Sequence, residues 1–324
     1  MKEVLNLLKY TLRRLKDLIP TIFLVATLIF IVTRIVPGDP ASAMLGPQAS
    51  PDEVVKLREE LGLNAPKITQ YLSYMKGLLR FDLGTSLRYN ESVFSMIMSR
   101  FPNTVILSIS SLFLALLFGI PIGIISASKK GSFIDFLFTS ISLLGVSIPV
   151  FWLGVMLVLF FSVNLGWFPA MGMGSMSEGL SVYIKHLVLP SITLATIPMA
   201  NFARILRSSM LDVMEQNYIK TARAKGVCKF KIIMKHAFKN AFTPLLTVIG
   251  MQLSSLLSGA VLTETIFSWP GMGRLIVDAI EKRDFIVVQG VVLFTAILYV
   301  FINLIVDLLY KVVNPKVNID VGGK

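Results

Sequence analysis

Six long apolar segments constrain the fold of this chain more than any other feature of its sequence. Each one approaches the roughly 20 residues that an α-helix needs to cross the hydrocarbon core of a bilayer. The predicted spans are Leu18–Val36, Asn103–Ala127, Phe133–Val163, Leu187–Arg207, Phe242–Phe267 and Phe285–Tyr310. With 54% hydrophobic and 15% charged residues in a chain of 324, the composition excludes an ordinary soluble domain. The sequence therefore predicts an all-α polytopic membrane protein with six transmembrane helices.

The basic residues decide the orientation of these spans. Both termini and the loops after the second and fourth spans are rich in lysine and arginine, whereas the short outer loops carry only Lys185, Arg274, Lys282 and Arg283. Because basic loops stay in the cytoplasm, both termini are predicted to lie inside. The net charge of +12 is then explained by the orientation of the spans and by attraction to anionic lipid. Nucleic-acid binding is not needed to account for it.

This topology divides the chain into four parts. Residues 1–36 form a cytoplasmic N-terminus and the first span, 37–102 an extracytoplasmic segment, 103–310 the membrane core with a cytoplasmic loop at 208–241, and 311–324 a cytoplasmic tail. The N-terminal region, up to Ala41-Ser42-Ala43, is similar to a secretory signal followed by its cleavage site. Its apolar run, however, is longer than the apolar run of such signals. Near the outer end of the first span, Arg34 is expected to extend to the lipid headgroups.

The extracytoplasmic segment is predicted to be a small ordered helical unit. Ser50-Pro51-Asp52-Glu53 is typical of a capped helix start, and this helix should end near Leu61-Gly62. A second helix is expected from Pro66, and a turn-rich stretch follows from Phe81 to Val93. Amphipathic helices and aromatic residues favour order over a flexible loop.

Helix-breaking residues interrupt two of the predicted spans. The third contains Gly145, Pro149 and Gly154, and the fourth contains Pro190 and Pro198. Such residues suit spans that line a polar path, and they suit kinked packing helices equally well. The candidate polar residues of a translocation path are Thr193, Asn201, Gln252 and Asn303.

The loop between the fourth and fifth spans is strongly basic and has helical periodicity. From Tyr218 to Pro244 it carries seven lysines and arginines and no acidic residue. One apolar stripe, which starts at Leu211, ends at Lys225-Gly226, a typical helix end, and a second begins at Phe230. Two short amphipathic helices around a glycine, inside the cell and joined to membrane spans, suit docking onto a soluble partner.

A break is also expected beyond the fifth span. Trp269-Pro270-Gly271 should end the helix at the outer interface, where tryptophan favours the headgroup level. A short helix is predicted to follow before the last span opens at Asp284-Phe285.

No constellation for catalysis stands out in the sequence. The ATP-binding pattern G-x-x-x-x-G-K-[ST] is absent, since Gly322-Gly323-Lys324 lacks both the following hydroxyl residue and the earlier glycine. His186 and His236 are predicted on opposite sides of the membrane and cannot share a metal ion, and the single Cys228 excludes an internal disulfide. The chain is therefore predicted to be neither an enzyme nor a metal or cofactor protein. An ion-coupled secondary transporter is an alternative, but it would need ionisable groups near the midplane, where only uncharged polar residues occur.

Several strings together resemble the permeases of ABC importers of the dipeptide, oligopeptide and nickel group. The general motif of these permeases is Glu-Ala-Ala, three residues and glycine, and the loop here has Lys220-Thr221-Ala222 followed by Gly226. A basic residue, threonine and alanine are usual in the peptide and nickel subgroup. The outer segment from Val36 and the stretch from Glu264 to Gly290 are also similar, so the likeness covers nearly the whole chain.

This resemblance implies one permease subunit of a binding-protein-dependent importer, a multi-pass protein of the cytoplasmic (inner) membrane of a bacterium or archaeon. The implied partners are a second homologous permease chain, two cytoplasmic ABC ATPase subunits that bind ATP and Mg, an extracytoplasmic solute-binding protein and membrane lipid. The resemblance places the contact with the ATPases at Tyr218, Lys220, Thr221, Ala222, Arg223, Lys225 and Gly226. Small peptides are the first choice of substrate, nickel or its chelate the second, and oligosaccharides the third.

Overall fold

The structure is a computed structural model, and it describes residues 2–35, 40–45, 49–60, 62–86 and 88–313. Within these ranges a single bridge between Thr85 and Ser92 is the only pairing of extended chain, which confirms the all-α prediction. The long elements are α1 Lys2–Ile35, α5 Val93–Ser128, α6 Phe133–Ser147, α7 Val150–Leu157, α8 Leu180–Met214, α11 Lys239–Gly259 and α14 Phe285–Val313. The short ones are α2 Pro40–Leu45, α3 Pro51–Glu60, α4 Lys67–Leu78, α9 Asn217–Ala224, α10 Lys229–Lys231, α12 Val261–Ile266 and α13 Met272–Glu281. Two π-helical segments, Val158–Asn164 and Ile232–Phe238, continue α7 and α10.

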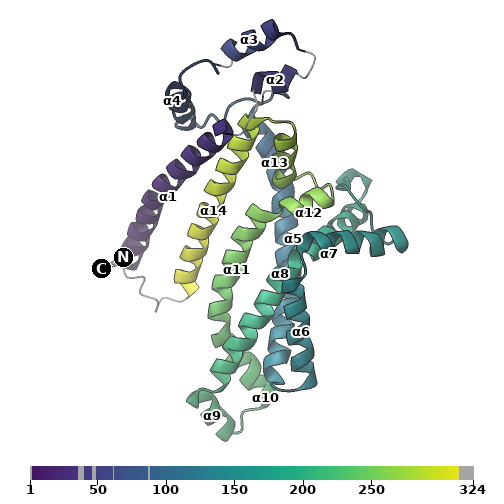
Figure 1. The fold of residues 1–324 in the computed structure, drawn as a ribbon. Helices are drawn as coiled ribbons and strands as arrows, with labels where there is room; N and C mark the ends of the chain where they lie inside the picture. Colours follow the sequence, from purple (N-terminus) through teal and green to yellow (C-terminus); the bar gives the residue numbers. More distant parts are fainter. Residues whose placement is uncertain (1, 36–39, 46–48, 61, 87, 314–324) are drawn as a thin grey trace.

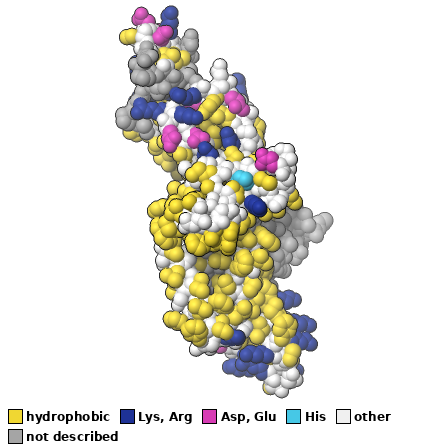
Figure 2. All heavy atoms as spheres, turned by 90° about the vertical axis from the view of Figure 1, so that its right-hand side faces the viewer, with side chains coloured by type: hydrophobic (Ala, Val, Ile, Leu, Met, Phe, Trp, Pro, Cys, Tyr) yellow, Lys and Arg dark blue, Asp and Glu magenta, His cyan; other side chains and the backbone are white. Residues whose placement is uncertain are grey.

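Among the described residues, four helices are long and apolar enough to cross a membrane: α5, α8, the continuous helix from α10 through α11, and α14. The bent pair of α6 and α7 makes a fifth span if it is counted as one. The apolar part of α1, Ile19–Ile35, is shorter. Figure 2 shows a broad apolar zone between two ends that carry the charged side chains. These features support a polytopic membrane protein, while the count of six spans stays a prediction.

The third predicted span, Phe133–Val163, is not one straight helix. Its two halves, α6 and α7, are bent by 102° at the break between them. Ile148 has an extended backbone, with φ −78° and ψ 125°, because the ring of Pro149 disfavours helical backbone in the residue before it. Pro190 and Pro198, in contrast, lie inside the continuous helix α8. Of the predicted breakers, Pro149 is therefore the one that redirects the chain.

Several other predicted span boundaries differ from the structure. Helix α5 begins at Val93 rather than Asn103, because Pro102 is accommodated inside the helix. Helix α8 covers Leu180–Met214 and so extends beyond both predicted ends. The fifth span stops at Gly259, and α12 follows as a separate short helix.

The centre of the membrane body is the long contact between α5 and α8 (Figure 1). A Cβ atom on Gly119 or Gly123 of α5 would lie 2.7 or 2.8 Å from the carbonyl oxygen of Met199 or Ala203 of α8. Such small residues let two helix backbones approach closely inside a membrane. The main buried core surrounds this contact and comprises Ala115, Ala127, Ala195, Phe202, Leu206, Met210, Ala237, Ala241 and Leu245.

The outer segment contains the two predicted helices. Ser50 and Glu53 form a capping box, in which the Glu53 amide donates to Ser50 Oγ (3.3 Å) and the Ser50 amide donates to Glu53 Oε2 (2.9 Å). These hydrogen bonds lower the pKa of the Glu53 carboxyl group. Helix α4 begins directly after Pro66, and Gly62 has the positive φ of a turn residue. Both predicted helix starts are confirmed.

Helix α4 is fastened to the outer end of α1. The hydroxyl groups of Thr27 and Tyr71 share a hydrogen bond of 2.8 Å, and Arg34 Nε donates to Gln70 Oε1 at 3.1 Å. The Arg34 guanidinium also lies over the ring of Phe30, 5.0 Å from its centroid. The position of Arg34 at the lipid headgroups stays a prediction, and α4 provides a protein partner that the sequence did not indicate.

The chain turns tightly between α12 and α13, in a segment that we call the outer elbow (residues 261–274). Glu264 is fully buried there and accepts hydrogen bonds from the Thr104 hydroxyl of α5 (2.7 Å) and the Arg274 amide (3.1 Å). Thr104 in turn accepts a hydrogen bond from the Met272 amide (2.9 Å). The first amides of α13, which have no partner within the helix, are thereby satisfied. A Cβ atom on Gly271 would overlap the Glu264 carboxyl group, so the elbow needs a glycine there.

The tryptophan of the outer elbow is enclosed by protein. Trp269 is fully buried, and its Nε1 donates to the carbonyl oxygen of Asn103 at 2.9 Å. Its ring packs beside Tyr183 of α8, with 6.3 Å between the centroids. The indole N–H therefore has its partner on α5 and not in the lipid headgroups, while the depth of this residue in the membrane stays a prediction. The short helix and the last span predicted after this break are confirmed as α13 and α14.

Candidate functional site

The candidate site is the end of the molecule that is predicted to be cytoplasmic, where α9 and α10 lie below the long helices (Figure 1). The apolar stripe from Leu211 was expected to continue in one helix to Gly226, but α8 ends at Met214 and α9 starts at Asn217. Gln216 breaks the helix because its backbone is extended, with ψ 148°. The second predicted helix is confirmed, since α10 begins at Lys229 and runs on into α11.

Gly226 closes α9 in the way that the sequence predicts. Its φ is +76°, a left-handed conformation that glycine adopts without steric cost. The Gly226 amide donates to the Arg223 carbonyl (3.0 Å), and the Val227 amide donates to the Ala222 carbonyl (3.1 Å). Two carbonyl groups at the end of α9 are thereby satisfied. No atom lies within 4 Å of a Cβ placed on Gly226, so the backbone conformation, and not lack of space, requires glycine.

Helix α9 has an inward face and an outward face. Ile219 is fully buried, and Ala222, one turn later on the same side, is half-buried. Asn217, Lys220, Thr221 and Ala224 are exposed. At 100° per residue these four lie on the side opposite Ile219 and Ala222. The structure therefore turns Ala222 toward the other helices of this chain and presents Lys220, Thr221 and Ala224 outward.

The other predicted residues of this loop flank α9. The Tyr218 hydroxyl accepts a hydrogen bond from Asn240 Nδ2 (2.8 Å), which ties α9 to the start of α11. Arg223 lines a cavity of about 450 Å³ that α9 shares with the turn between α5 and α6. The cations of the loop are all exposed: Lys220, Arg223, Lys225, Lys229, Lys231, Lys235 and Lys239. Figure 2 shows lysine and arginine side chains gathered at this end of the molecule. The structure thus brings the predicted loop residues together around one exposed basic helix.

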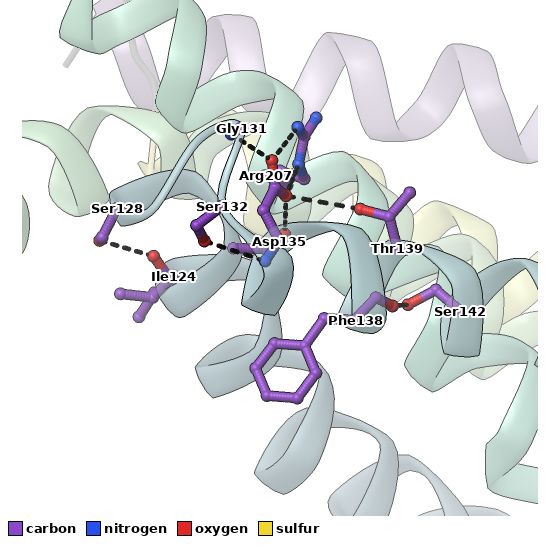
Figure 3. Close-up of polar contacts among 10 residues, drawn as sticks. Ile124, Ser128, Gly131, Ser132, Asp135, Phe138, Thr139, Ser142 and Arg207 are labelled. Atoms are coloured by element: carbon purple, nitrogen blue, oxygen red, sulfur yellow. Dashed lines mark hydrogen bonds and ion pairs between the residues drawn. The ribbon is translucent and has the colours of Figure 1, made fainter.

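Above this loop lies an ion pair that the sequence analysis missed (Figure 3). Asp135 of α6 is only 4% exposed, and Arg207 of α8 holds it with two bonds, Nε to Oδ1 at 2.7 Å and a terminal guanidinium nitrogen to Oδ2 at 2.8 Å. The carboxylate also accepts hydrogen bonds from the Ser126 hydroxyl of α5 and from the Gly131 amide at 3.0 Å. One carboxylate therefore joins α5, the turn after it, α6 and α8.

A second ion pair joins the same parts at the surface. Lys130 Nζ lies 3.2 Å from Glu215 Oε1, and the two side chains are 61% and 71% exposed. Lys130 belongs to the turn between α5 and α6, and Glu215 to the break between α8 and α9. For the buried pair, the sequence does contain a local signal at Asp135. Ser132 and Asp135 have the spacing of a capping box, which predicts the start of α6, and the Asp135 amide donates to Ser132 Oγ (3.3 Å).

The four predicted path residues have different surroundings. Thr193 is fully buried, and its hydroxyl donates to the Leu189 carbonyl (2.8 Å). Asn303 accepts a hydrogen bond from Ser254 (3.0 Å), a contact between α14 and α11. Asn201 accepts one from Arg204 of its own helix (3.0 Å), and Gln252 is half-buried on α11. None of these hydrogen bonds joins two of the four residues.

The histidines, carboxylates and the cysteine form no metal-binding group of three or more within the part of the chain that the structure describes. The His186 Nδ1 lies 3.0 Å from the carbonyl oxygen of Val182 on its own helix. Cys228 is exposed beside Lys229 at the start of α10.

Comparison with known proteins agrees with this architecture. The family model described as "Binding-protein-dependent transport system inner membrane component" matches residues 119–319, and the model of its N-terminal part matches residues 7–108. The chain is 45% identical to the dipeptide transport system permease protein DppB of Alkalihalophilus pseudofirmus, over 96% of this chain and 99% of that one. It is 41% identical to DppB of Escherichia coli K12 over the same shares. It is 40% identical to the oligopeptide permease protein AppB of Bacillus subtilis, over 95% and 98%.

A solved structure shares the fold. The methionine ABC transporter MetNI in inward-facing conformations matches with a TM-score of 0.55 and 18% identity, over 68% of this chain and 97% of the matched chain. The match of the family model to residues 119–319 extends through the membrane body and includes the basic loop. This chain belongs to the family of inner-membrane components of binding-protein-dependent transport systems.

Proposed function

We propose that this chain is a permease subunit of an ATP-driven ABC importer and that it passes di- and oligopeptides inward across the cytoplasmic membrane of a bacterium or archaeon. The observation that carries the proposal is the identity of 40–45%, over nearly the whole length, to relatives named as dipeptide and oligopeptide permeases. A relative of Salmonella paratyphi A at 40% identity is named for glutathione, itself a small peptide. Nickel chelates and oligosaccharides are the alternatives within the family.

The assembly that we propose contains a second homologous permease subunit, two cytoplasmic ATPase subunits and an extracytoplasmic solute-binding protein. ATP and Mg would be bound by the ATPases, which is consistent with the lack of a nucleotide-binding motif in this sequence. The exposed helix α9 supports contact with the ATPases, because it presents lysine, threonine and alanine below the membrane body. Asn201, Gln252, Thr193 and Asn303 stay proposals for the translocation path; Thr193 is buried, and the other three are half-exposed.

The proposed mechanism begins at α9. When the ATPases close on ATP, α9 seated in a groove of one subunit would be displaced as a rigid body. Its inward face is packed through Ile219, and its Tyr218 is bonded to Asn240, so the displacement reaches both α8 and α11. Movement of these two helices would then change which side of the membrane the path opens to.

The function can be tested with the complete complex in proteoliposomes. Uptake of a labelled dipeptide should require ATP, the binding protein and both permease subunits, and the peptide should stimulate ATP hydrolysis. The chain alone, given a proton gradient and no ATPases, should accumulate nothing. Gradient-driven uptake by the lone chain would establish the secondary transporter instead. A binding protein that co-purifies with nickel or a sugar would replace peptides as the substrate.

The topology makes a separate prediction. A reporter inserted after Lys130, or at Lys225 in the basic loop, should be cytoplasmic, whereas reporters near Asn64 and Ser177 should lie outside. The expectation follows from the excess of cations at the α9 end of the molecule. Reporter activity and accessibility to an impermeant thiol reagent would check it. An outside signal at Lys225 would contradict the proposed contact with cytoplasmic ATPases.

Replacement of Gly226 with valine should weaken this contact. A β-branched residue at φ +76° would be strained by about 1–2 kcal/mol, so the turn after α9 would reorganise. Asparagine tolerates the left-handed region, and Gly226→Asn is therefore the matched control. We expect normal membrane insertion of both variants, a clear loss of peptide-stimulated ATP hydrolysis for valine, and near-normal activity for asparagine. Equal activity of the two variants would show that the turn is not required.

A further inference from the structure

Helix α6 lies against α8 and α5, and its one buried side chain is charged. Asp135 is its only buried residue. Its large apolar side chains are exposed to an unusual extent, with Phe133 at 76% and Phe136 at 70%. Within the described residues, the buried apolar clusters and the side chains packed on them include nothing from α6. A cavity of about 60 Å³ lies between α5, α6 and α8 beside Arg207, so apolar packing is incomplete there.

A buried ion pair is a poor means of stabilising a fold, because desolvation of the two charges offsets most of their attraction. What such a pair provides is a fixed geometry, since two parallel hydrogen bonds to a carboxylate hold the guanidinium group in one orientation. Asp135 and Arg207 have this arrangement, with bonds of 2.7 and 2.8 Å. The pair therefore fixes how α6 lies against α8.

The position of the pair connects two moving parts. Arg207 lies on α8 beyond both prolines of that helix and before its end at Met214, so an uninterrupted stretch of helix leads from Arg207 toward α9. On the other side of the pair, α6 leads to the 102° bend and then to α7, which packs against α8 and α12. Displacement of α9 and α8 would thus reach α6 through the pair, whereas α7 also has its own contact with α8.

We propose that Asp135 is a positioning residue for energy coupling: its bond to Arg207 makes α6 follow α8 when the ATPases move α9. This inference rests on the proposed importer function. Loss of the bond would leave α9, its contact with the ATPases and ATP hydrolysis in place. It would separate hydrolysis from the movement of α6, so that more ATP is consumed for each peptide transported.

The test uses the complete complex in proteoliposomes, with a labelled dipeptide, and measures ATP hydrolysis and uptake in the same vesicles. The variants are Asp135→Asn, which keeps the shape and removes the charge, and the double variant Asp135→Asn/Arg207→Gln, which leaves no unpaired buried charge. Glu215→Gln is the matched control, because it breaks the exposed pair between the same two parts of the chain. The ATP consumed per peptide should rise at least about fivefold in both Asp135 variants, because the coupling between two sites of a protein typically changes an equilibrium by at least about this factor. It should be unchanged in Glu215→Gln.

A structural role would give a different result. If the Asp135 variants lose hydrolysis and uptake in equal proportion, the ratio stays constant and the proposal is overturned. It is also overturned if neither the single nor the double variant assembles with the ATPases, because Asp135 would then serve folding. A wild-type complex without ATP-dependent peptide uptake would instead refute the proposed function, so the two failures are distinguishable.

A covalent substitute for the ion pair gives an independent readout. In a chain with Cys228→Ser, the substitutions Asp135→Cys and Arg207→Cys should raise the ATP cost per peptide, and a cleavable bifunctional thiol reagent spanning the two sites should lower it again. Cleavage of the reagent should restore the high cost. A cross-link that forms and leaves the ratio unchanged would count against the proposal.

Discussion

Replacement of Gly271 with alanine is expected to prevent the outer elbow from closing. The added methyl group would overlap the carboxyl group of Glu264, which is fully buried and would lose its hydrogen bonds to Thr104 and Arg274 if it moved aside. Overpacking together with buried groups left unsatisfied would cost about 2–5 kcal/mol. We expect a marked loss of folded protein and a lower melting temperature of the purified complex, measured by fluorescence-detected size-exclusion chromatography after heating.

The cause of this effect can be isolated with a second substitution. Glu264→Ala removes the carboxyl group and opens the space, so Gly271→Ala should be far less harmful in that background than in the wild type. Gly77→Ala in α4 is the matched control, since its Cβ would meet only the Asp82 carbonyl oxygen at an ordinary 3.4 Å, and alanine is favoured over glycine in a helix. Equal damage from Gly271→Ala in both backgrounds would show that Glu264 is not what excludes a side chain.

The sequence predicted best those features that depend on residues close together in the chain. The capping box at Ser50 and Glu53, the left-handed turn at Gly226 and the short helix before α14 each follow from a few neighbouring residues. Apolar runs likewise identified the membrane helices, because crossing a bilayer requires length and composition and little else. These signals survive in almost any tertiary context.

The features that could not be predicted depend on distant partners. Asp135 and Arg207 are 72 residues apart, and Thr104 and Glu264 are 160 apart, so nothing local says that they meet. For the same reason Arg34 and Trp269 were assigned to the membrane surface, although each has a partner on another helix. The rules for interfacial residues assume lipid or water as the neighbour, and here the neighbour is protein.

Helix α9 shows a third kind of limit. Its periodicity correctly indicated an amphipathic helix, but it could not tell which face meets the permease and which is offered to a partner. Ala222 belongs to the motif that suggested contact with the ATPases, and yet it shares the inward face with the buried Ile219. Small residues at both Ala222 and Ala224 permit close approach on either face, so only the tertiary structure separates their roles.

The same substitution on the two faces should therefore have opposite consequences. Ala224→Asp places a carboxylate on the outward face, where it would be desolvated against the ATPase without a designed partner. We expect this permease to insert and melt normally in isolation, while its affinity for the ATPase subunits falls at least about tenfold, which corresponds to roughly 1.4 kcal/mol. Binding of the purified ATPases to the permease pair in nanodiscs, measured at fixed ionic strength, would check this.

Ala222→Asp is the matched comparison, and its damage should lie within the permease. The carboxylate would enter the half-buried side of α9 beside Ile219, so α9 should detach from the membrane helices and the hydrogen bond between Tyr218 and Asn240 should be lost. The melting temperature of the isolated permease should then fall, as it does not for Ala224→Asp. If Ala222→Asp leaves the isolated permease unchanged and abolishes ATPase binding, while Ala224→Asp binds normally, the two faces of α9 have been assigned the wrong way round. The pair of variants thus decides which surface of this helix receives the force of ATP hydrolysis.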